Sequence, residues 1–591
     1  MLSTPTDNPR PHQIQGVPAW ARRIYDALVT WRAMVRRHWP FVILLAVGVA
    51  LRAAVTVAYR PALIYIDTPR YLGGDQGGLD PLGYTYLLLR PVLLAGGGLT
   101  GVAVVQHALG LAMAACLYVL AIRHGTGRWL AALAAAPVLL DAYQVQAEQT
   151  IMPDVLFEAL IVAAMTILLW RPPSLGRLTC GAALLGLSAT VRQVGELLVL
   201  PLLAYALIAA PEHWRSRAVQ AAAALAVFAL PVFGYMALAS TLLGTGFRLS
   251  NMNDAYLYAR LAYAADCATL SVPGYARPMC PAPPTKTRLG VDGLSTDPSS
   301  AVFSYRPPPG ISRGAATRSF DRAVLTQQPL RVASSIASDA IKVFALTRDT
   351  AQGDPPIARW QFQETFPVYR AADATVSVKP QVTKPLADGL RKYQMHGGYT
   401  PGPLLLAFLI AGIYGTFRYF VRGPCLLATG LAVTAAGGAD LYEFSWRYQL
   451  PLLVTLPLAG ALGVAALRLA VTRRSGGGGT MGRCTTTRTS PRSGPSPAAL
   501  STPTTGCGSA ETRSSAVTDP GAAMPSSSDA TSPWLSRQNA ADSTSSRNTA
   551  TRWRGAAGRS HRAASRTARA ARLRNSPGWN SPRRPGSAPS T

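Results

Sequence analysis

Apolar residues along the chain form long unbroken runs instead of an alternating pattern. Several runs are roughly 17–25 residues long, the length a helix needs to cross about 30 Å of hydrocarbon. The runs predict an all-α polytopic membrane protein with about ten transmembrane helices. We expect these helices at residues 40–58, 101–122, 129–146, 154–170, 178–191, 195–210, 218–243, 401–420, 424–439 and 448–471.

The connections between these runs differ in charge, and the difference predicts an orientation. Pairs of arginines occur in five connections, at 123–128, 171–177, 211–217, 418–423 and 473–477. Acidic residues occur in the connections on the other side, namely Asp141, Glu148, Asp154, Asp440 and Glu443. Because cytoplasmic loops of membrane proteins carry an excess of Lys and Arg, we expect the arginine-rich connections in the cytoplasm. Ten spans then place both termini there as well.

This topology divides the chain into five regions. A helical pattern rich in Trp and Arg at 24–39 is typical of an interfacial helix. The long region of mixed polarity after the seventh span contains an amphipathic helical pattern at 330–346. The regions are a cytoplasmic N-terminal segment (1–39), a transmembrane module (40–243) with a first external loop at 59–100, an extracytoplasmic loop domain (244–400), C-terminal transmembrane helices (401–471) and a tail (475–591).

The tail differs in composition from the rest of the chain. It lacks Tyr, Phe, Ile and Lys, and it holds 16 arginines against 4 acidic residues. Such a segment cannot bury an apolar core, which predicts a disordered basic tail. A translated frameshift in GC-rich DNA would give the same composition. The other reading frames of the gene distinguish the two explanations.

Overall composition agrees with a membrane protein and changes the interpretation of the charge. Hydrophobic residues make up 49% and charged residues 14% of the chain, with a mean hydropathy of +0.17. The formal net charge of +29 is of the sign that favours nucleic acid. In a membrane protein the same excess is explained by cytoplasmic loops and by contact with anionic lipid. We therefore expect membrane lipid, and no nucleic acid, among the partners.

The seven cysteines give one candidate disulfide and no metal site. None of them forms a CxxC pair, so a zinc or thioredoxin-like site has no support. The histidines are dispersed, and no metal ligands are assigned. Cys267 and Cys280 share one polar loop, and if that loop is extracytoplasmic the two can form a disulfide.

Several charged residues that could carry chemistry are expected at one membrane surface. Acids in or beside membrane segments are costly to place and are functional candidates by default. A carboxylate there can take a proton from a hydroxyl group, and arginines can bind a phosphate with paired hydrogen bonds. Alternatively, each residue only ends a helix at the level of the lipid headgroups. The candidates are Asp67, Glu148, Asp154, Arg192, Arg447 and Tyr448.

Four segments carry a resemblance to a known family. They read "YIDTPRYL" after the first span, "LLDAYQVQAEQTIMPDVLFEALI" at 139–161, "ATVRQVGELLVLPLL" at 189–203 and "SWRYQLPLLVTLPLAGALG" at 445–463. In this order the chain resembles the GT-C glycosyltransferases that use polyprenyl-phosphate sugars, in particular protein O-mannosyltransferases and aminoarabinose transferases. The loop at 257–281 looks like one in actinobacterial members.

The resemblance implies an inverting sugar transfer, with or without the help of a divalent metal. It implies Asp67 as the catalytic base and Asp154 as the second acidic position. Arg192 and Arg447 fall where family arginines lie near the lipid phosphate, and Glu148 and Tyr448 complete the expected substrate-binding set. Thr68 departs from the adjacent Asp-Glu of the O-mannosyltransferases, so the roles of that second acid are not carried over.

The resemblance further implies a polyprenyl-phosphate-linked sugar as donor, an extracytoplasmic acceptor and a bacterial plasma membrane as location. A non-enzymatic transporter or flippase for lipid-linked sugars is the alternative. Such a protein is expected to have broken helices with polar groups near the middle of the membrane. Charges gathered at one surface favour the enzyme.

Overall fold

A computed structural model describes residues 19–65, 67–73, 80–209, 213–244, 246–251, 253–365, 369–370, 377–378 and 381–476. The predicted tail from residue 477 onward and the first 18 residues lie outside this set. The described chain is almost entirely helical, with only four two-residue strands. The expectation of an all-α membrane protein is therefore confirmed, and the prediction about the tail stays a prediction.

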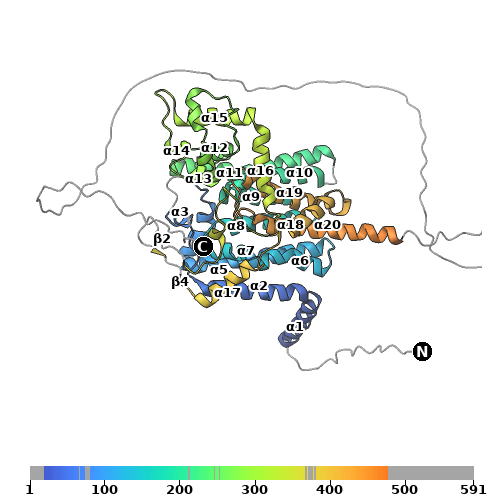
Figure 1. The fold of residues 1–591 in the computed structure, drawn as a ribbon. Helices are drawn as coiled ribbons and strands as arrows, with labels where there is room; N and C mark the ends of the chain where they lie inside the picture. The colour runs from blue at the N-terminus through green and yellow to red at the C-terminus, as the bar shows by residue number, and fades with distance from the viewer. Residues whose placement is uncertain are drawn as a thin grey trace, which may run out of the picture. The chain divides into compact units, whose positions relative to one another are not determined.

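The apolar runs all form helices, which pack into one bundle (Figure 1). The first two runs and the last two, for example, closely match the observed helix bounds. The helices are α2 (Trp39–Ala58), α5 (Gly98–Arg123), α6 (Arg128–Leu140), α7 (Ala142–Gln149), α8 (Asp154–Leu169), α9 (Leu175–Val191), α10 (Val199–Ala209), α11 (Trp214–Leu243), α18 (Gly402–Thr416), α19 (Arg422–Asp440) and α20 (Pro451–Gly476).

Length and composition support fewer membrane spans than ten. Among the described residues, five helices are long and apolar enough to cross a membrane, or six if the bent pair α6 and α7 counts as one span. The five spans are Trp39–Ala58, Gly98–Arg123, Trp214–Leu242, Tyr419–Asp440 and Pro451–Val471. The protein is thus a multi-pass membrane protein, while the count of ten is not confirmed.

The predicted helix 129–146 is broken at Asp141. The Asp141 side chain accepts a hydrogen bond from the backbone N–H of Tyr143, 3.0 Å away, and so caps a new helix. The axis bends by 49° between α6 and α7 as a result. A short capped helix, α7, thus replaces the end of a straight span, and it carries Glu148 into the protein interior.

Close packing of α18 against α20 depends on small residues. A Cβ atom at Gly463 would collide with the carbonyl of Ala411, and one at Gly412 would press on Ala459. Small residues let helix backbones approach closely in membrane proteins, where apolar burial alone does not drive association. The two helices are therefore held at one fixed register, which positions the chain that enters α20.

One end of the bundle is rich in arginine and tryptophan. Trp39 packs edge-on against Trp129, and the Arg123 guanidinium lies 4.7 Å from the ring centre of Trp170. Helix α1 (Ala19–Arg37) reaches the same end, because Arg128 hydrogen-bonds to the carbonyl of Arg37. These contacts bring together connections that the charge pattern assigned to the cytoplasm, and Figure 1 shows α20 ending on this side.

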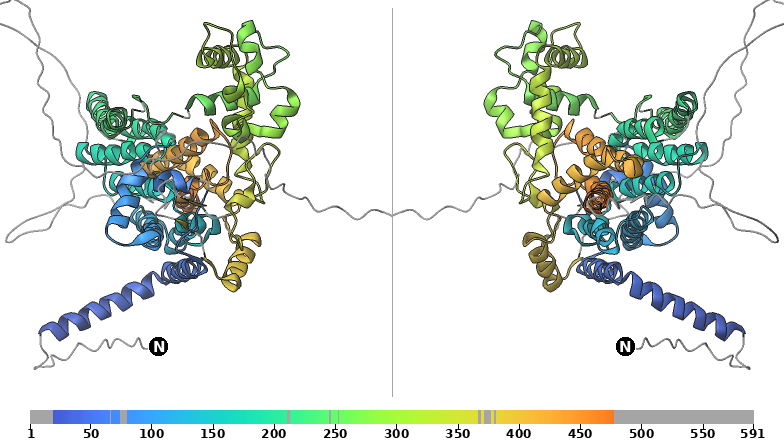
Figure 2. Two further views of the ribbon diagram at one scale, coloured as in Figure 1. Left: turned by 90° about the vertical axis from the view of Figure 1, so that its left-hand side faces the viewer. Right: turned by 90° about the vertical axis from the view of Figure 1, so that its right-hand side faces the viewer.

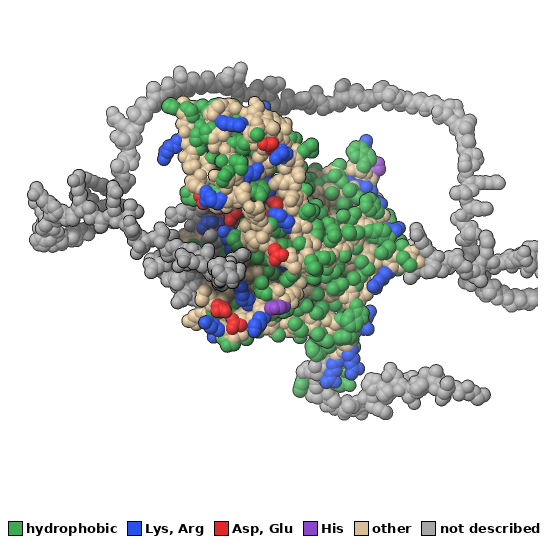
Figure 3. All heavy atoms as spheres, in the orientation of Figure 1, with side chains coloured by type: hydrophobic (Ala, Val, Ile, Leu, Met, Phe, Trp, Pro, Cys, Tyr) green, Lys and Arg blue, Asp and Glu red, His purple; other side chains and the backbone are tan. Residues whose placement is uncertain are grey.

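The bundle and the region after α11 differ in surface character. Exposed apolar side chains line α18, among them Leu406, Ile410 and Ile413, as expected for contact with lipid. Figure 3 shows hydrophobic side chains spread over the bundle, whereas charges of both signs dot the neighbouring lobe. This lobe, residues 253–342, is called the cap below.

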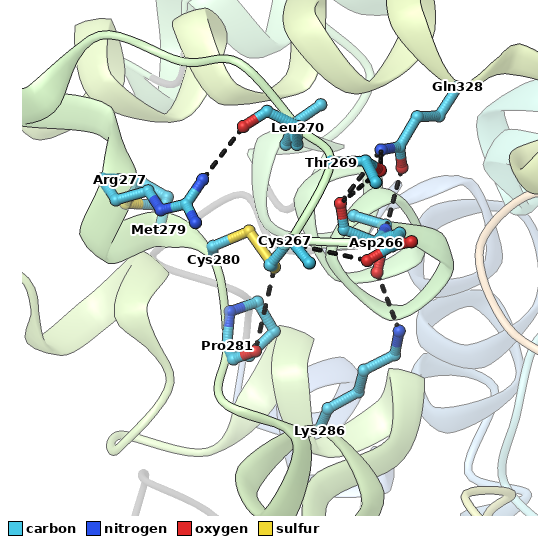
Figure 4. The surroundings of a disulfide bond; sticks show 12 residues. Asp266, Cys267, Thr269, Leu270, Arg277, Met279, Cys280, Pro281, Lys286 and Gln328 are labelled. Carbon is cyan, nitrogen blue, oxygen red and sulfur yellow. Dashed lines mark hydrogen bonds between the residues drawn. A yellow bond between two sulfur atoms is a disulfide. The ribbon is translucent and has the colours of Figure 1, made fainter.

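The cap has its own helices and its own core, and it stands beside the bundle in both views of Figure 2. Buried side chains such as Tyr258, Leu294 and Phe320 form that core. Cys267 and Cys280, the pair that shares a polar loop, form a disulfide near the end of α12 (Figure 4). The cap helices are α12 (Asn253–Ala264), α13 (Pro283–Thr296), α14 (Ala301–Ser304), α15 (Arg313–Gln327) and α16 (Pro329–Lys342), with a 3-10 turn, η3 (Gly274–Met279), between α12 and α13.

Candidate functional site

The chain after α2 is fixed against the chain before α8, and this fixes Asp67. Leu63 forms a parallel bridge with Thr150, and its carbonyl accepts from the N–H of Ile151 at 3.1 Å. The hydroxyl of Thr68 donates to the carbonyl of Ile151 and accepts from the N–H of Tyr65. Thr68 is fully buried, so in this chain it has a structural role. Asp67 precedes the short helix α3 (Thr68–Gly73).

Arg447 joins Asp67 to Asp154. It lies in the segment between α19 and α20, and its Nη1 is 2.8 Å from Asp67 Oδ2. Its Nε lies 3.0 Å and 3.1 Å from the two oxygens of Asp154, and its Nη2 lies 2.9 Å from Asp154 Oδ2. The side chain of Arg447 is 7% exposed. One buried guanidinium is thus neutralised by two carboxylates from distant parts of the chain.

Arg192 approaches the same carboxylate from the connection between α9 and the 3-10 helix η2 (Gln193–Leu198). Its Nη1 hydrogen-bonds to Asp154 Oδ1. Its guanidinium carbon lies 4.8 Å from the ring centre of Tyr448, which is a cation–π distance. Sequence reasoning expected Asp67, Asp154, Arg192, Arg447 and Tyr448 at one place, and the structure brings these five together.

Arg70 and Asp80 extend this network and were missed from the sequence. Arg70 Nη2 lies 2.8 Å from Asp67 Oδ1, and its Nε bonds to Asp80 Oδ2. Both oxygens of Asp67 are therefore already bonded to guanidinium groups. The i,i+3 spacing of Asp67 and Arg70 was the available signal, because residues so spaced face each other when the chain is helical.

These side chains face a cavity of about 360 Å³ between the bundle and the cap, within the usual range for a small-ligand site. The cap contributes Tyr256 and Asp292 to its lining, and the 3-10 helix η4 (Ile357–Trp360) contributes Arg359 and Trp360. Asp154 does not line the cavity; it lies behind Arg192 and Arg447. Asp154 thus contacts two lining arginines but not the cavity itself, and its predicted substrate-binding role stays a prediction.

Glu148 is not brought to this cavity. It is completely buried inside the bundle, where its Oε1 lies 2.7 Å from Arg52 Nη2 and its Oε2 lies 2.9 Å from His107 Nδ1. The sequence placed Glu148 at the membrane surface because it reads as a loop residue. Helix α7 instead turns this carboxylate towards α2 and α5. Its predicted role in substrate binding is therefore not supported by its position.

Glu443 was seen in the sequence only as one acid on the external side. It lines the cavity, and 7% of its surface is exposed. Burial raises the pKa of its carboxyl group to about 8, and Asp292 adds to this shift. Burial likewise holds the pKa of the neighbouring Tyr448 hydroxyl well above its usual value. Both groups therefore keep their protons at neutral pH.

The cavity acids do not form a metal site as they stand. Over the described part of the chain, no group of three or more His, Cys, Asp and Glu side chains is placed to hold a metal ion. The oxygens of Asp67 and Asp154 bond to arginines, which a cation would first have to displace. The described residues therefore do not fit a divalent metal as they are paired here, and no ligands are assigned to one.

Comparison with known proteins gives only distant likenesses. No family model and no curated protein matches the chain. The archaeal oligosaccharyltransferase AglB from Archaeoglobus fulgidus, in complex with an inhibitory peptide and a dolichol-phosphate, is 11% identical with a TM-score of 0.37. The match covers 76% of this chain and 53% of that one, so this chain spans about half the archaeal enzyme.

ArnT from Cupriavidus metallidurans in the apo state is 14% identical, with a TM-score of 0.29. That match covers 71% of this chain and 77% of ArnT. Neither likeness is close enough to carry an argument about the function of this chain.

Proposed function

We propose that this protein is an integral membrane glycosyltransferase. It moves a sugar from a polyprenyl-phosphate donor to an acceptor outside the cytoplasm, and it resides in a bacterial plasma membrane. The observation that carries the proposal is the meeting of Asp67, Arg192 and Arg447 at one cavity, on a membrane-embedded helical bundle. The resemblance of the four sequence segments to polyprenyl-phosphate-sugar transferases supports the same class.

Two arginines supply a site for the donor phosphate. Guanidinium groups bind phosphate oxygens with paired, charge-assisted hydrogen bonds. Arg192 is the more exposed of the two, at 16% against 7% for Arg447. Asp154 holds both guanidinium groups from behind and so orients them towards the cavity. A lipid-linked phosphate reaches such a site from the membrane, while its sugar extends into the cavity.

Asp67 is the proposed proton acceptor. The acceptor hydroxyl oxygen attacks the anomeric carbon, and the bond from that carbon to the phosphate oxygen breaks. The bonding electron pair leaves on the phosphate, where the arginines stabilise its charge, and the hydroxyl proton passes to Asp67. One displacement inverts the configuration at the anomeric carbon. General-base assistance of this kind contributes roughly 10²–10⁴-fold in rate.

The proposal is tested with membranes that contain the protein and radiolabelled polyprenyl-phosphate mannose, arabinose and glucose. Label in a new acceptor product, together with release of polyprenyl phosphate, is the expected result. Movement of a lipid-linked sugar across liposomes without covalent transfer would contradict the proposal and support a flippase. The Arg192→Ala variant tests the phosphate site in the same assay. It should transfer sugar only at a raised donor concentration.

A further inference from the structure

Glu443 has a carboxyl oxygen that no described group satisfies. It lies in the segment that joins α19 to α20, four residues before Arg447. Its Oε2 is buried and has no hydrogen-bond partner in the described part of the protein. An unsatisfied buried polar atom is costly, so such an atom in a cavity lining points to a ligand that completes its hydrogen bonding.

The charges around the cavity set Glu443 apart from the other acids of the lining. Asp67 and Asp80 pair with Arg70, Asp67 pairs also with Arg447, and Asp292 pairs with Arg359 at 2.9 Å. No ion pair is found for Glu443 among the described residues. Together with the raised pKa, this means that Glu443 presents a protonated carboxyl group at neutral pH.

A protonated carboxyl group has one O–H donor and further acceptor capacity. It can therefore exchange hydrogen bonds with an uncharged hydroxyl group, which is likewise both donor and acceptor. A phosphate group offers only acceptors at neutral pH. The arginines, which are cationic and only donate hydrogen bonds, match it better than Glu443 does. The chemistry of Glu443 thus fits a polyhydroxylated ligand better than an anion.

Tyr448 lies beside one of the arginines of the site. Its ring lies against the Arg192 guanidinium, and it lines the same cavity as Glu443. The charges of Asp292 and Arg359 also act on Glu443: Asp292 raises the pKa of its carboxyl group and Arg359 lowers it. Glu443 thus lines the same cavity as Arg192 and the cap residue Asp292, and a sugar attached to a phosphate on Arg192 would extend into that cavity.

We propose that Glu443 binds the transferred sugar by exchanging hydrogen bonds with its hydroxyl groups. This inference rests on the proposed function and deepens it, because it assigns the sugar-binding part of the cavity. Glu443 is distinct from Asp67, which takes the proton, and from the two arginines, which bind the phosphate.

Two substitutions separate hydrogen bonding from charge. Glu443→Gln keeps the shape, one donor and one acceptor, and should bind the sugar-linked donor within about threefold of wild type. Glu443→Leu removes the donor and the acceptor, and should weaken binding about tenfold, which corresponds to about 1.4 kcal/mol, the size of one or two net hydrogen bonds. Glu364→Leu, an exposed glutamate outside the cavity lining, is the matched control and should change nothing.

The experiment measures binding of two probes to purified protein in detergent: the polyprenyl-phosphate sugar that supports transfer, and sugar-free polyprenyl phosphate. The expected result is that Glu443→Leu loses affinity for the first probe and keeps affinity for the second. Equal loss for both probes, or no loss for either, would overturn the inference and leave the proposed function standing. So would a Glu443→Gln protein that binds the donor normally but no longer transfers the sugar.

Failure of the proposed function has a different signature. Wild-type protein would then bind none of the three sugar-linked lipids more tightly than sugar-free polyprenyl phosphate. That result would overturn both proposals together. Gel filtration of each variant shows whether it is folded, and Glu443→Ala, which also removes the donor and the acceptor, replaces Glu443→Leu if that variant is not.

Discussion

Arg447 Nη1 lies 2.8 Å from Asp67 Oδ2, although 380 positions separate the two residues in the chain. The same guanidinium holds Asp154 at the start of α8. Three segments, one after α2, one entering α8 and one entering α20, are therefore joined at a single buried cation. The candidate site and a structural joint of the bundle are the same group of atoms.

Removing this cation should be strongly destabilising. Arg447→Met leaves Asp154 buried with one arginine fewer, and breaking a buried pair from one side costs about 3–5 kcal/mol. Arg447→Lys keeps the charge but not the paired hydrogen bonds, so it should be more stable than the Met variant and still bind the donor weakly. Thermal unfolding in detergent and donor binding measure the two effects.

The matched control is Arg359→Met. Arg359 pairs with Asp292 but is 40% exposed, and exposed pairs contribute about 0–1 kcal/mol. An Arg447→Met protein no less stable than the Arg359 variant would contradict the structural role of Arg447.

Gly110 tests whether Glu148 is structural. A Cβ atom at this position of α5 would collide with the Glu148 carboxylate, and overpacking typically costs about 1–3 kcal/mol. Gly110→Ala should therefore lower the unfolding temperature without raising the KM for the donor. Gly234→Ala in α11 is the control, because nothing lies within 4 Å of the added Cβ. A raised KM in a stable Gly110→Ala protein would contradict a purely structural role and would support a role of Glu148 in substrate binding.

The disulfide should stabilise the cap. Cys267 and Cys280 are 13 positions apart, and closing a loop of this size stabilises by about 3 kcal/mol in the chain-entropy model. Cys267→Ser with Cys280→Ser should make the cap more sensitive to proteolysis while the bundle stays folded. Maleimide labelling of these two thiols only after reduction checks the bond. Labelling without reduction would show that the bond does not form.

Stability should fall as the pH rises from about 4.5 to 8. Burial raises the pKa of Glu443 to about 8, and burial with the charge of Asp254 does the same for Asp321 in the cap. Folded protein therefore holds protons that the unfolded chain releases above its ordinary carboxyl pKa, so stabilisation present at low pH is lost as the pH passes 8. Unfolding temperatures across this range measure it. Glu443→Gln should flatten the fall; an unchanged slope would contradict the assignment.

The helices and part of the site could be predicted from the sequence because their signals are local. Apolar runs locate the bundle helices, and acids or arginines at helix ends located Asp67, Asp154, Arg192 and Arg447. The break at Asp141 follows a capping rule, yet the apolar run around it concealed the break. Asp141 also accepts from the N–H of Thr400, a contact that no local pattern reveals.

The direction in which a short polar helix faces could not be predicted. Helix α7 turns Glu148 towards Arg52 because the bundle offers a buried cation there, which depends on packing across 96 positions. Trp360 and Arg359 come from a loop region without hydrophobic periodicity. The sequence therefore carried no signal that these two residues line the cavity. Glu443 was visible as an acid, but its burial and its missing partner are tertiary properties.

The most direct test of the central claim compares Asp67→Asn with Asp80→Asn. Both substitutions remove one carboxylate from the cavity lining, but only Asp67 is assigned the proton. Sugar transfer from a radiolabelled polyprenyl-phosphate donor is measured with variants that elute as folded protein and still bind the donor. We expect Asp67→Asn to lose at least roughly 100-fold in kcat, as for the loss of a general base, and Asp80→Asn to keep most of its activity. A folded Asp67→Asn protein that transfers sugar at the wild-type rate would contradict the account.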